Sequence, residues 1–320
     1  MNVALDRTTD LRQSHLCVNH PASSHRQYPM RKQLVIALFS VFLLPVCGSN
    51  QPRGNSHATG DFAGEEGLDY DPDKLVRFEL VASTDVLKPD ETATLGALFH
   101  IAEGWHIYWI NPGDSGLATR ITLDAVTGVA LGQPQFPGPV RFDSEGDIHN
   151  YGYHGTLLVP ISMAATNNDS GTVQVRAKAT WLACREDACV PGDGQASLSL
   201  PASVTDRERA ARSAQIQAAL AQVPRPVSAY PADADSSFEV SLADGKARVR
   251  VRGPKDASLD VFPVIDAAIS EVERTGDDKS QALHFTLSPQ GDTVQLAVLS
   301  VRIGSETTFF SITSEQFANQ

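Results

Sequence analysis

The sequence of 320 residues predicts an all-β protein, with an antiparallel β-sandwich followed by one helix and a second, smaller β domain. Three observations support this fold class. Short segments alternate apolar and polar residues with a period of two, which is typical of strands that have one solvated face. Turns rich in proline and glycine separate these segments, as in β-sandwiches. One alanine-rich segment carries the start and stop signals of a helix.

The first 70 residues are expected to direct export rather than to fold. Residues 1–29 form a polar leader, and Met30 is the expected true start because such a leader rarely precedes a signal peptide. Residues 30–47 match a secretory signal peptide, with two basic residues before an apolar run. That run has roughly a dozen residues, whereas a transmembrane helix needs about 20. Residues 48–70, rich in small polar residues, are predicted to be a linker.

Export predicts a periplasmic or secreted protein. A lipid anchor at Cys47 is an alternative, although lipoprotein signals place a small residue before the cysteine and Val46 is not small. Residues 1–47 carry five basic and two acidic residues, so 21 basic and 36 acidic residues remain, with a net charge of −15. No basic stripe stands out, which argues against a nucleic-acid partner.

Residues 71–203 are predicted to form the first sandwich. The clearest strand covers residues 173–181, where valine, alanine and tryptophan alternate with polar side chains. Turn sequences such as residues 111–113 and 136–139 separate the strand patterns. The alternation predicts antiparallel sheets with one face in the core.

Residues 204–236 are predicted to hold the helix and a second linker, and residues 237–320 the second β domain. Thr205 and Glu208 have the spacing of a capping box, which predicts a helix over residues 207–223. Two prolines end this segment, and strand patterns then resume.

The main chemical motif is the pair Cys184 and Cys189, which flanks a polar insert where the clearest strand ends. In an oxidising compartment these two cysteines can form a bond, and a structural disulfide is one interpretation. A loop this short removes only about 2 kcal/mol of unfolded-state entropy, against about 3 for fifteen residues, so reversible exchange is the other interpretation. Arg185 favours a thiolate, whereas Glu186 and Asp187 oppose it.

A metal site is a further alternative. His149 and His154 have the same spacing as Cys184 and Cys189, and two cysteines with two histidines can bind zinc or copper(I). The histidines are expected in a loop, however, and nothing in the sequence brings the two pairs together.

The segment Gly113–Gly116 echoes the nucleophile turn of trypsin-like proteases, but its flanks differ, and a tight turn explains its glycines. Aromatic residues are concentrated in two other segments. Core packing is the ordinary reason for such residues, and an apolar wall beside the cysteines is the functional one. The residues concerned are Trp105, His106, Tyr108, Trp109, Tyr151 and Tyr153. On its own, His106 is expected to be a structural histidine.

Three separated motifs occur in an order that resembles a known family. They are Trp105-His106-x-Tyr108-Trp109-x-Asn111-Pro112-Gly113-Asp114-Ser115-Gly116, Tyr151-Gly152-Tyr153-x-Gly155 and Trp181-Leu182-x-Cys184-x4-Cys189-x-Pro191. Over about residues 70–200 the chain resembles the N-terminal domain of DsbD-type thiol:disulfide interchange proteins. It is most similar to the ScsB-like branch, which is linked to copper tolerance.

The resemblance implies an immunoglobulin-like sandwich with a redox-active cysteine pair and no cofactor. It implies that Cys189 forms mixed disulfides, that Cys184 resolves them, and that the aromatic residues and His106 bind or cap the partner. Such a protein-disulfide reductase relays electrons from a membrane-embedded carrier or a thioredoxin-like protein to periplasmic disulfide-bearing clients.

Two departures from the family pattern matter. The better-known DsbD domain has five residues between its cysteines, whereas four lie between Cys184 and Cys189. Family members also continue into transmembrane and thioredoxin-like domains, so the donor is expected on a separate polypeptide. Two other functions stay open: a non-enzymatic exported binding module with a structural disulfide, and a copper- or zinc-binding protein.

Overall fold

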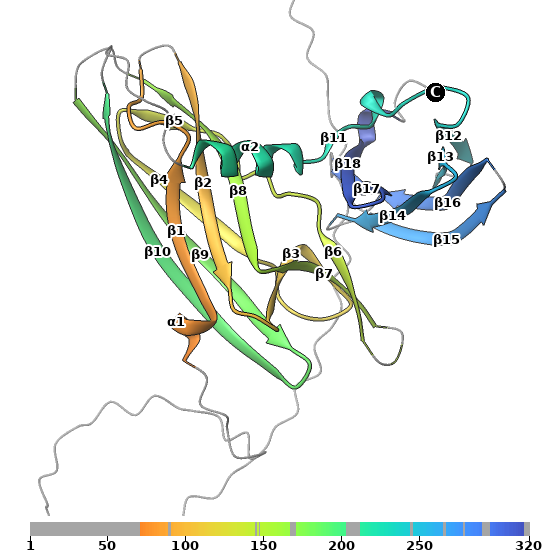
Figure 1. Ribbon diagram of the computed structural model, residues 1–320, viewed down its shortest axis with the longest axis horizontal. Helices are drawn as coiled ribbons and strands as arrows, with labels where there is room; N and C mark the ends of the chain where they lie inside the picture. The colour runs from red at the N-terminus through yellow and green to blue at the C-terminus, as the bar shows by residue number, and fades with distance from the viewer. Residues whose placement is uncertain are drawn as a thin grey trace, which may run out of the picture. The chain divides into compact units, whose positions relative to one another are not determined.

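The computed structural model describes residues 71–88, 91–144, 146, 148–166, 171–202, 212–243, 246–264, 267–277, 279–289 and 295–316. These residues confirm the predicted all-β class (Figure 1). The predicted leader, signal peptide and first linker, residues 1–70, lie outside them. Within the described ranges no helix has the length and apolar character needed to cross a membrane.

The first β region consists of two sheets packed face to face, in an immunoglobulin-like arrangement. One sheet has the order β1-β2-β8-β5, and the other has the order β10-β9-β3-β7-β6 with β4 paired to β9. Every pairing between these strands is antiparallel, as the period-two pattern predicts. The strands are β1 Val76–Ala82, β2 Thr92–Ile101, β3 His106–Gly113, β4 Arg120–Thr127, β5 Val129–Leu131, β6 Val140–Ser144, β7 Ile148–His154, β8 Thr156–Ala165, β9 Gly171–Arg185 and β10 Ala188–Ala202.

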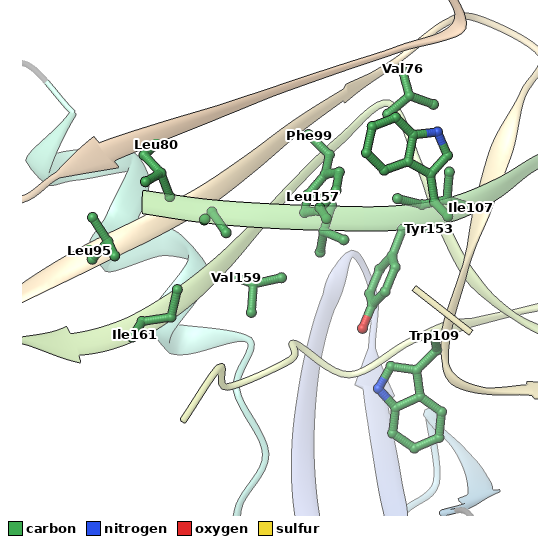
Figure 2. Close-up of a cluster of buried hydrophobic side chains, with 14 of the residues drawn as sticks. Val76, Leu80, Leu95, Phe99, Ile107, Trp109, Tyr153, Leu157, Val159 and Ile161 are labelled. Atoms are coloured by element: carbon green, nitrogen blue, oxygen red, sulfur yellow. The ribbon is translucent and has the colours of Figure 1, made fainter. Parts of the chain in front are cut away.

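The core of this sandwich lies between the two sheets. Alternate residues of β9, from Val173 to Ala183, are buried, and most of those between them are exposed or partly exposed. The rings of Phe99 on β2 and Trp181 on β9 meet edge to face at 5.7 Å, which joins one sheet to the other. Figure 2 shows Phe99, Ile107 and other apolar side chains of both sheets in this cluster.

A helix, α2 Ser213–Ala221, covers the outer face of the first sheet. Its Ile216 is fully buried in a small apolar cluster with Val81, Leu98 and Leu158. The helix ends two residues before the predicted end, and the predicted start and capping box lie outside the described residues. A one-turn helix, α1 Pro72–Leu75, precedes β1.

The second β region, like the first, consists of two sheets, and here each sheet has four strands. Their orders are β11-β18-β17-β14 and β12-β13-β16-β15, and both contribute to a core that includes Val251, Leu283 and Leu299. Strand β11 falls in the segment predicted as a linker and pairs in parallel with β18. The elements are β11 Arg225–Pro226, η1 Val227–Ala229, β12 Ser237–Ala243, β13 Lys246–Pro254, β14 Ala257–Pro263, β15 Ala267–Gly276, β16 Ser280–Pro289, β17 Gln295–Ile303, β18 Glu306–Thr313 and η2 Ser314–Gln316.

Candidate functional site

The two cysteines face each other across the β9–β10 hairpin. Strand β9 ends at Arg185 and β10 begins at Ala188, so only Glu186 and Asp187 form the turn. In the strand register Cys184 is the partner of Cys189, their Cα atoms are 4.1 Å apart, and a disulfide joins them. The bond therefore links neighbouring residues of a hairpin that strand pairing already holds together.

The two sulfur positions differ in exposure. Cys184 is only 2% exposed, whereas Cys189 is exposed. An attacking thiolate needs access to one sulfur of a disulfide, and the other sulfur then leaves. This arrangement exposes Cys189 to solvent and keeps Cys184 buried.

One of the two acidic residues of the hairpin turn pairs with the arginine that precedes it. The Arg185 guanidinium donates two hydrogen bonds to the Asp187 carboxylate, at 2.6 and 2.9 Å. These bonds and the positive charge of Arg185 lower the pKa of Asp187. The same guanidinium lies over the ring of Trp105, 5.4 Å from its centroid. Arg185 thus contacts an acidic side chain, Asp187, and an aromatic side chain, Trp105.

Two cysteines and two histidines form a row across four neighbouring strands. Cys189 on β10 pairs with Cys184 on β9, Cys184 pairs with His106 on β3, and His106 pairs with His154 on β7. Directly opposite residues of antiparallel strands project from the same face of a sheet, with Cβ atoms about 4.5–5.5 Å apart. The sheet therefore places a histidine beside the buried cysteine and a second histidine beyond it.

His106 lies in an aromatic environment at the edge of an open cavity. Its ring stacks on Phe142 of β6 at 4.6 Å, with 24° between the planes, and meets Tyr108 edge-on at 5.2 Å. Its Nε2 atom is buried and has no hydrogen-bond partner among the described residues. Burial lowers the pKa of His106, and the positive charge of His154 lowers it further. The cavity measures about 530 Å³ and is lined by Glu103, Trp105, His106, Phe142 and His154, among others.

The other predicted aromatic residues lie deeper. Trp105, Trp109, Tyr151 and Tyr153 belong to the apolar core of the sandwich. Figure 2 shows Trp109 and Tyr153 within that cluster. The hydroxyl of Tyr153 donates to the carbonyl of Pro137 at 2.7 Å, and burial raises its pKa well above the ordinary value. Of the predicted set, His106 and Tyr108 share the face that carries the cysteines.

Both predicted metal-binding histidines lie on strand β7, so the expectation that they lie in a loop was wrong. The strand forms because alternate residues, Tyr151 and Tyr153, reach the core. His149 and His154 have opposite parity and so project from opposite faces. The His149 Nδ1 lies 2.7 Å from an Asp143 carboxylate oxygen. In the described part of the chain no group of three or more His, Cys, Asp or Glu side chains is placed to hold a metal.

The segment Gly113–Gly116 begins at the last residue of β3 and is hydrogen-bonded to β7. The Ser115 hydroxyl and backbone N–H both donate to the side-chain oxygen of Asn150, which is buried. The Asp114 carboxylate accepts a hydrogen bond from the backbone N–H of His149 at 2.8 Å. These bonds account for the polar residues of the motif by local structure, in agreement with the interpretation as a turn.

Sequence reasoning missed two features of this site. It did not place His106 next to Cys184, because that neighbourhood depends on the register of two strands far apart in sequence. It also did not single out Phe142, which stacks on His106 from β6. An isolated phenylalanine in a strand carries no signal that separates it from a core residue.

Comparison with known proteins gives one family match. Residues 73–201 match the family model described as thiol:disulfide interchange protein DsbD, N-terminal. A search of curated proteins gave no significant match to the chain.

Several solved structures are similar to this chain. The N-terminal periplasmic domain of ScsB from Proteus mirabilis is 18% identical, with a TM-score of 0.48, and the match covers 73% of this chain and 91% of that one. The reduced DsbD N-terminal domain from Neisseria meningitidis is also 18% identical, with a TM-score of 0.29, and the match covers 42% and 96% of the two chains. A marsupial T cell receptor is 13% identical, with a TM-score of 0.19, and the match covers 75% and 62%.

Proposed function

We propose that this chain, whose residues 73–201 match the DsbD N-terminal family model, is a periplasmic thiol:disulfide exchange protein. It relays electrons between a membrane-embedded carrier, or a thioredoxin-like protein, and periplasmic clients that bear disulfides. The reacting groups are the sulfur atoms of Cys184 and Cys189. The observation that carries the proposal is the unequal exposure of two bonded cysteines on one hairpin.

Loading with electrons begins at the exposed sulfur. A donor thiolate attacks Sγ of Cys189, the disulfide breaks, and Cys184 leaves as a thiolate that takes up a proton. In the mixed disulfide, the donor's first sulfur is bonded to Cys189. The donor's second thiolate then attacks this first sulfur and releases Cys189. The donor dithiol has become a disulfide, and the Cys184–Cys189 disulfide has become a dithiol, so two electrons have moved.

Delivery to a client reverses these steps. The Cys189 thiolate attacks the client disulfide and forms a mixed disulfide, while one client sulfur leaves as a thiolate. Cys184 then loses its proton and attacks Sγ of Cys189, which restores the internal disulfide and releases the second client thiol. Cys184 needs no access to the client in this step, which agrees with its burial.

The hairpin context supports exchange over a purely structural bond. The disulfide joins residues five apart in sequence, at the end of a hairpin whose strands pair along their whole length. A loop of this size gains only about 2 kcal/mol from closure. A bond that adds so little constraint is suited to repeated opening and closing.

Trapping a partner tests the proposal. In a Cys184→Ser variant, exposed Cys189 attacks a partner disulfide, and no internal thiol resolves the product, so a mixed disulfide should accumulate in periplasmic extracts. The matched Cys189→Ser variant keeps only the buried thiol and should trap much less. Equal or absent trapping by the two variants would contradict the proposed relay. Equilibration of the wild-type pair with glutathione then gives its reduction potential.

A further inference from the structure

His106 is half-buried, and its buried Nε2 atom has no hydrogen bond within the described part of the chain. Buried polar atoms are nearly always hydrogen-bonded, and an exception calls for an explanation such as a catalytic role. The Nε2 atom of His106 has no partner among the described residues, and the same holds there for Trp109 Nε1, Thr119 Oγ1 and Arg141 Nε. Of these four residues, His106 is the one whose partner in the strand register is a cysteine, Cys184.

We infer that the His106 imidazole is the hydrogen-bond and proton partner of the Cys184 sulfur, unpaired while the disulfide is closed and paired once it opens. This inference rests on the proposed function and assigns a role that the relay leaves open. A sulfur atom in a disulfide carries no proton and is a weak acceptor. Opening the bond makes Cys184 a thiolate or a thiol, which gives the imidazole a partner.

The other polar groups around the cysteine are already engaged or more distant. Arg185 donates two hydrogen bonds to Asp187. His154 is one strand farther from Cys184 than His106. His106 is thus the ionisable side chain that lies directly opposite the buried cysteine, and its Nε2 atom has no other hydrogen-bond partner among the described residues.

The environment of His106 suits a group that takes and returns a proton. Stacking on Phe142 fixes the plane of the ring, and burial with the neighbouring His154 favours the neutral imidazole. A neutral imidazole can accept the Cys184 proton when this thiol attacks Cys189. In the opposite direction the imidazolium returns the proton when Cys184 leaves. No further oxidant or reductant is needed, because the proton moves between two groups of this chain.

The inference predicts that His106 favours the open, reduced form. Replacing His106 by phenylalanine keeps a ring that can stack on Phe142 and removes both nitrogen atoms. Losing a hydrogen bond to the Cys184 sulfur should shift the equilibrium with glutathione about tenfold toward the disulfide. For a two-electron couple this shift corresponds to a potential about 30 mV lower. The matched control is His284→Phe, the same substitution on β16 of the second β region, which should leave the equilibrium unchanged.

The pH profile separates a proton role from a structural one. The rate at which Cys184 resolves a glutathione mixed disulfide on Cys189 should depend on imidazole protonation in the wild type and lose that dependence in His106→Phe. The titratable groups facing His106 are His154 on β7, Cys184 on β9, Tyr108 on its own strand and Glu103 in the same cavity. Equal equilibria and equal pH profiles in the wild type and His106→Phe would overturn the inference.

A measurement on the unaltered protein guards against a misfolded variant. In NMR titrations of wild-type protein, the pH at which the His106 ring titrates should differ between the reduced and the oxidised form, because the Cys184 sulfur becomes a hydrogen-bond partner of the imidazole only in the reduced form. Identical titrations would overturn the inference. If the pair fails to exchange with glutathione at all, the proposed relay itself fails. If it exchanges without any influence of His106, only this inference fails.

Discussion

Cys184 and Cys189 are paired across β9 and β10 with their Cα atoms 4.1 Å apart, yet one is 2% exposed and the other is exposed. The difference follows from their places on the hairpin. Cys184 precedes the turn and lies beside β3, with His106 opposite it. Cys189 belongs to β10, which is the edge strand of that sheet. The disulfide therefore connects an inner strand of the sheet, β9, to its edge strand, β10.

This difference predicts unequal thiol reactivity after reduction. Cys189 should be alkylated by iodoacetamide at least about tenfold faster than Cys184, because reaction requires an accessible thiolate. Mass spectrometry of peptides from briefly treated, reduced protein measures both rates. Full unfolding in urea is the control, since it should bring the two rates close together. Faster alkylation of Cys184 in the folded protein would contradict the assignment of Cys189 as the entry point.

The double variant Cys184→Ala/Cys189→Ala should remain folded. Because the loop is short and the hairpin is held by strand pairing, we expect the free energy of unfolding to fall by about 2 kcal/mol. Urea unfolding of the variant and of oxidised wild-type protein gives the difference. Reduced wild-type protein separates the effect of the bond from that of the two side chains. A loss above about 4 kcal/mol would instead favour a structural disulfide.

The sequence predicted the fold class well because strand alternation is a local property. The alternating residues from Val173 to Trp181 are buried and exposed as their parity requires. The cysteine bond was also foreseeable, since both residues flank one short insert. The row through His106 and His154 was not, because it depends on the pairing of β3 with β9 and β7. Register between distant strands is fixed by the whole core, so no local pattern reports it.

Gly152 separates the two core tyrosines of β7, at a position where β7 lies very close to β3. A Cβ atom at this position would lie 2.1 Å from the backbone oxygen of Ile107, on the strand that carries His106. Since backbone cannot yield as a side-chain end can, Gly152→Ala should push β7 away from β3 and lower the free energy of unfolding by at least about 2 kcal/mol. Chemical denaturation measures this loss.

The matched control for that variant is Gly155→Ala. A Cβ atom at Gly155 would meet nothing within 4 Å, but its φ of +69° is unfavourable for alanine. A cost of about 1 kcal/mol is therefore expected from backbone conformation alone. If Gly152→Ala proves as mild as Gly155→Ala, the close approach of β7 and β3 is not what the glycine provides.

Glu79 on β1 should make the stability of the first sandwich depend on pH. The hydrogen bond with His100 on β2, 2.9 Å long, lowers the pKa of Glu79 below its ordinary value of 4.5, and the charges of Arg77 and Arg212 contribute. A carboxyl group whose pKa is lower in the folded state stabilises that state above its unfolded pKa. This contribution is lost as the pH falls through the folded pKa. The relevant window therefore lies below about pH 4.5.

Glu79→Gln should accordingly reduce the free energy of unfolding at pH 7 by less than about 1 kcal/mol, as for a partly exposed ion pair. The variant should also lose less stability than the wild type between pH 7 and pH 3.5. Urea unfolding at the two pH values measures both effects, with Asp124→Asn, an exposed carboxylate on β4, as the control. A wild-type protein and a Glu79→Gln variant with the same pH dependence would show that the Glu79–His100 bond does not stabilise the folded chain. The pair joins β1 to β2. Such a result would therefore mean that strand pairing and core burial, rather than this bond, hold β1 against β2.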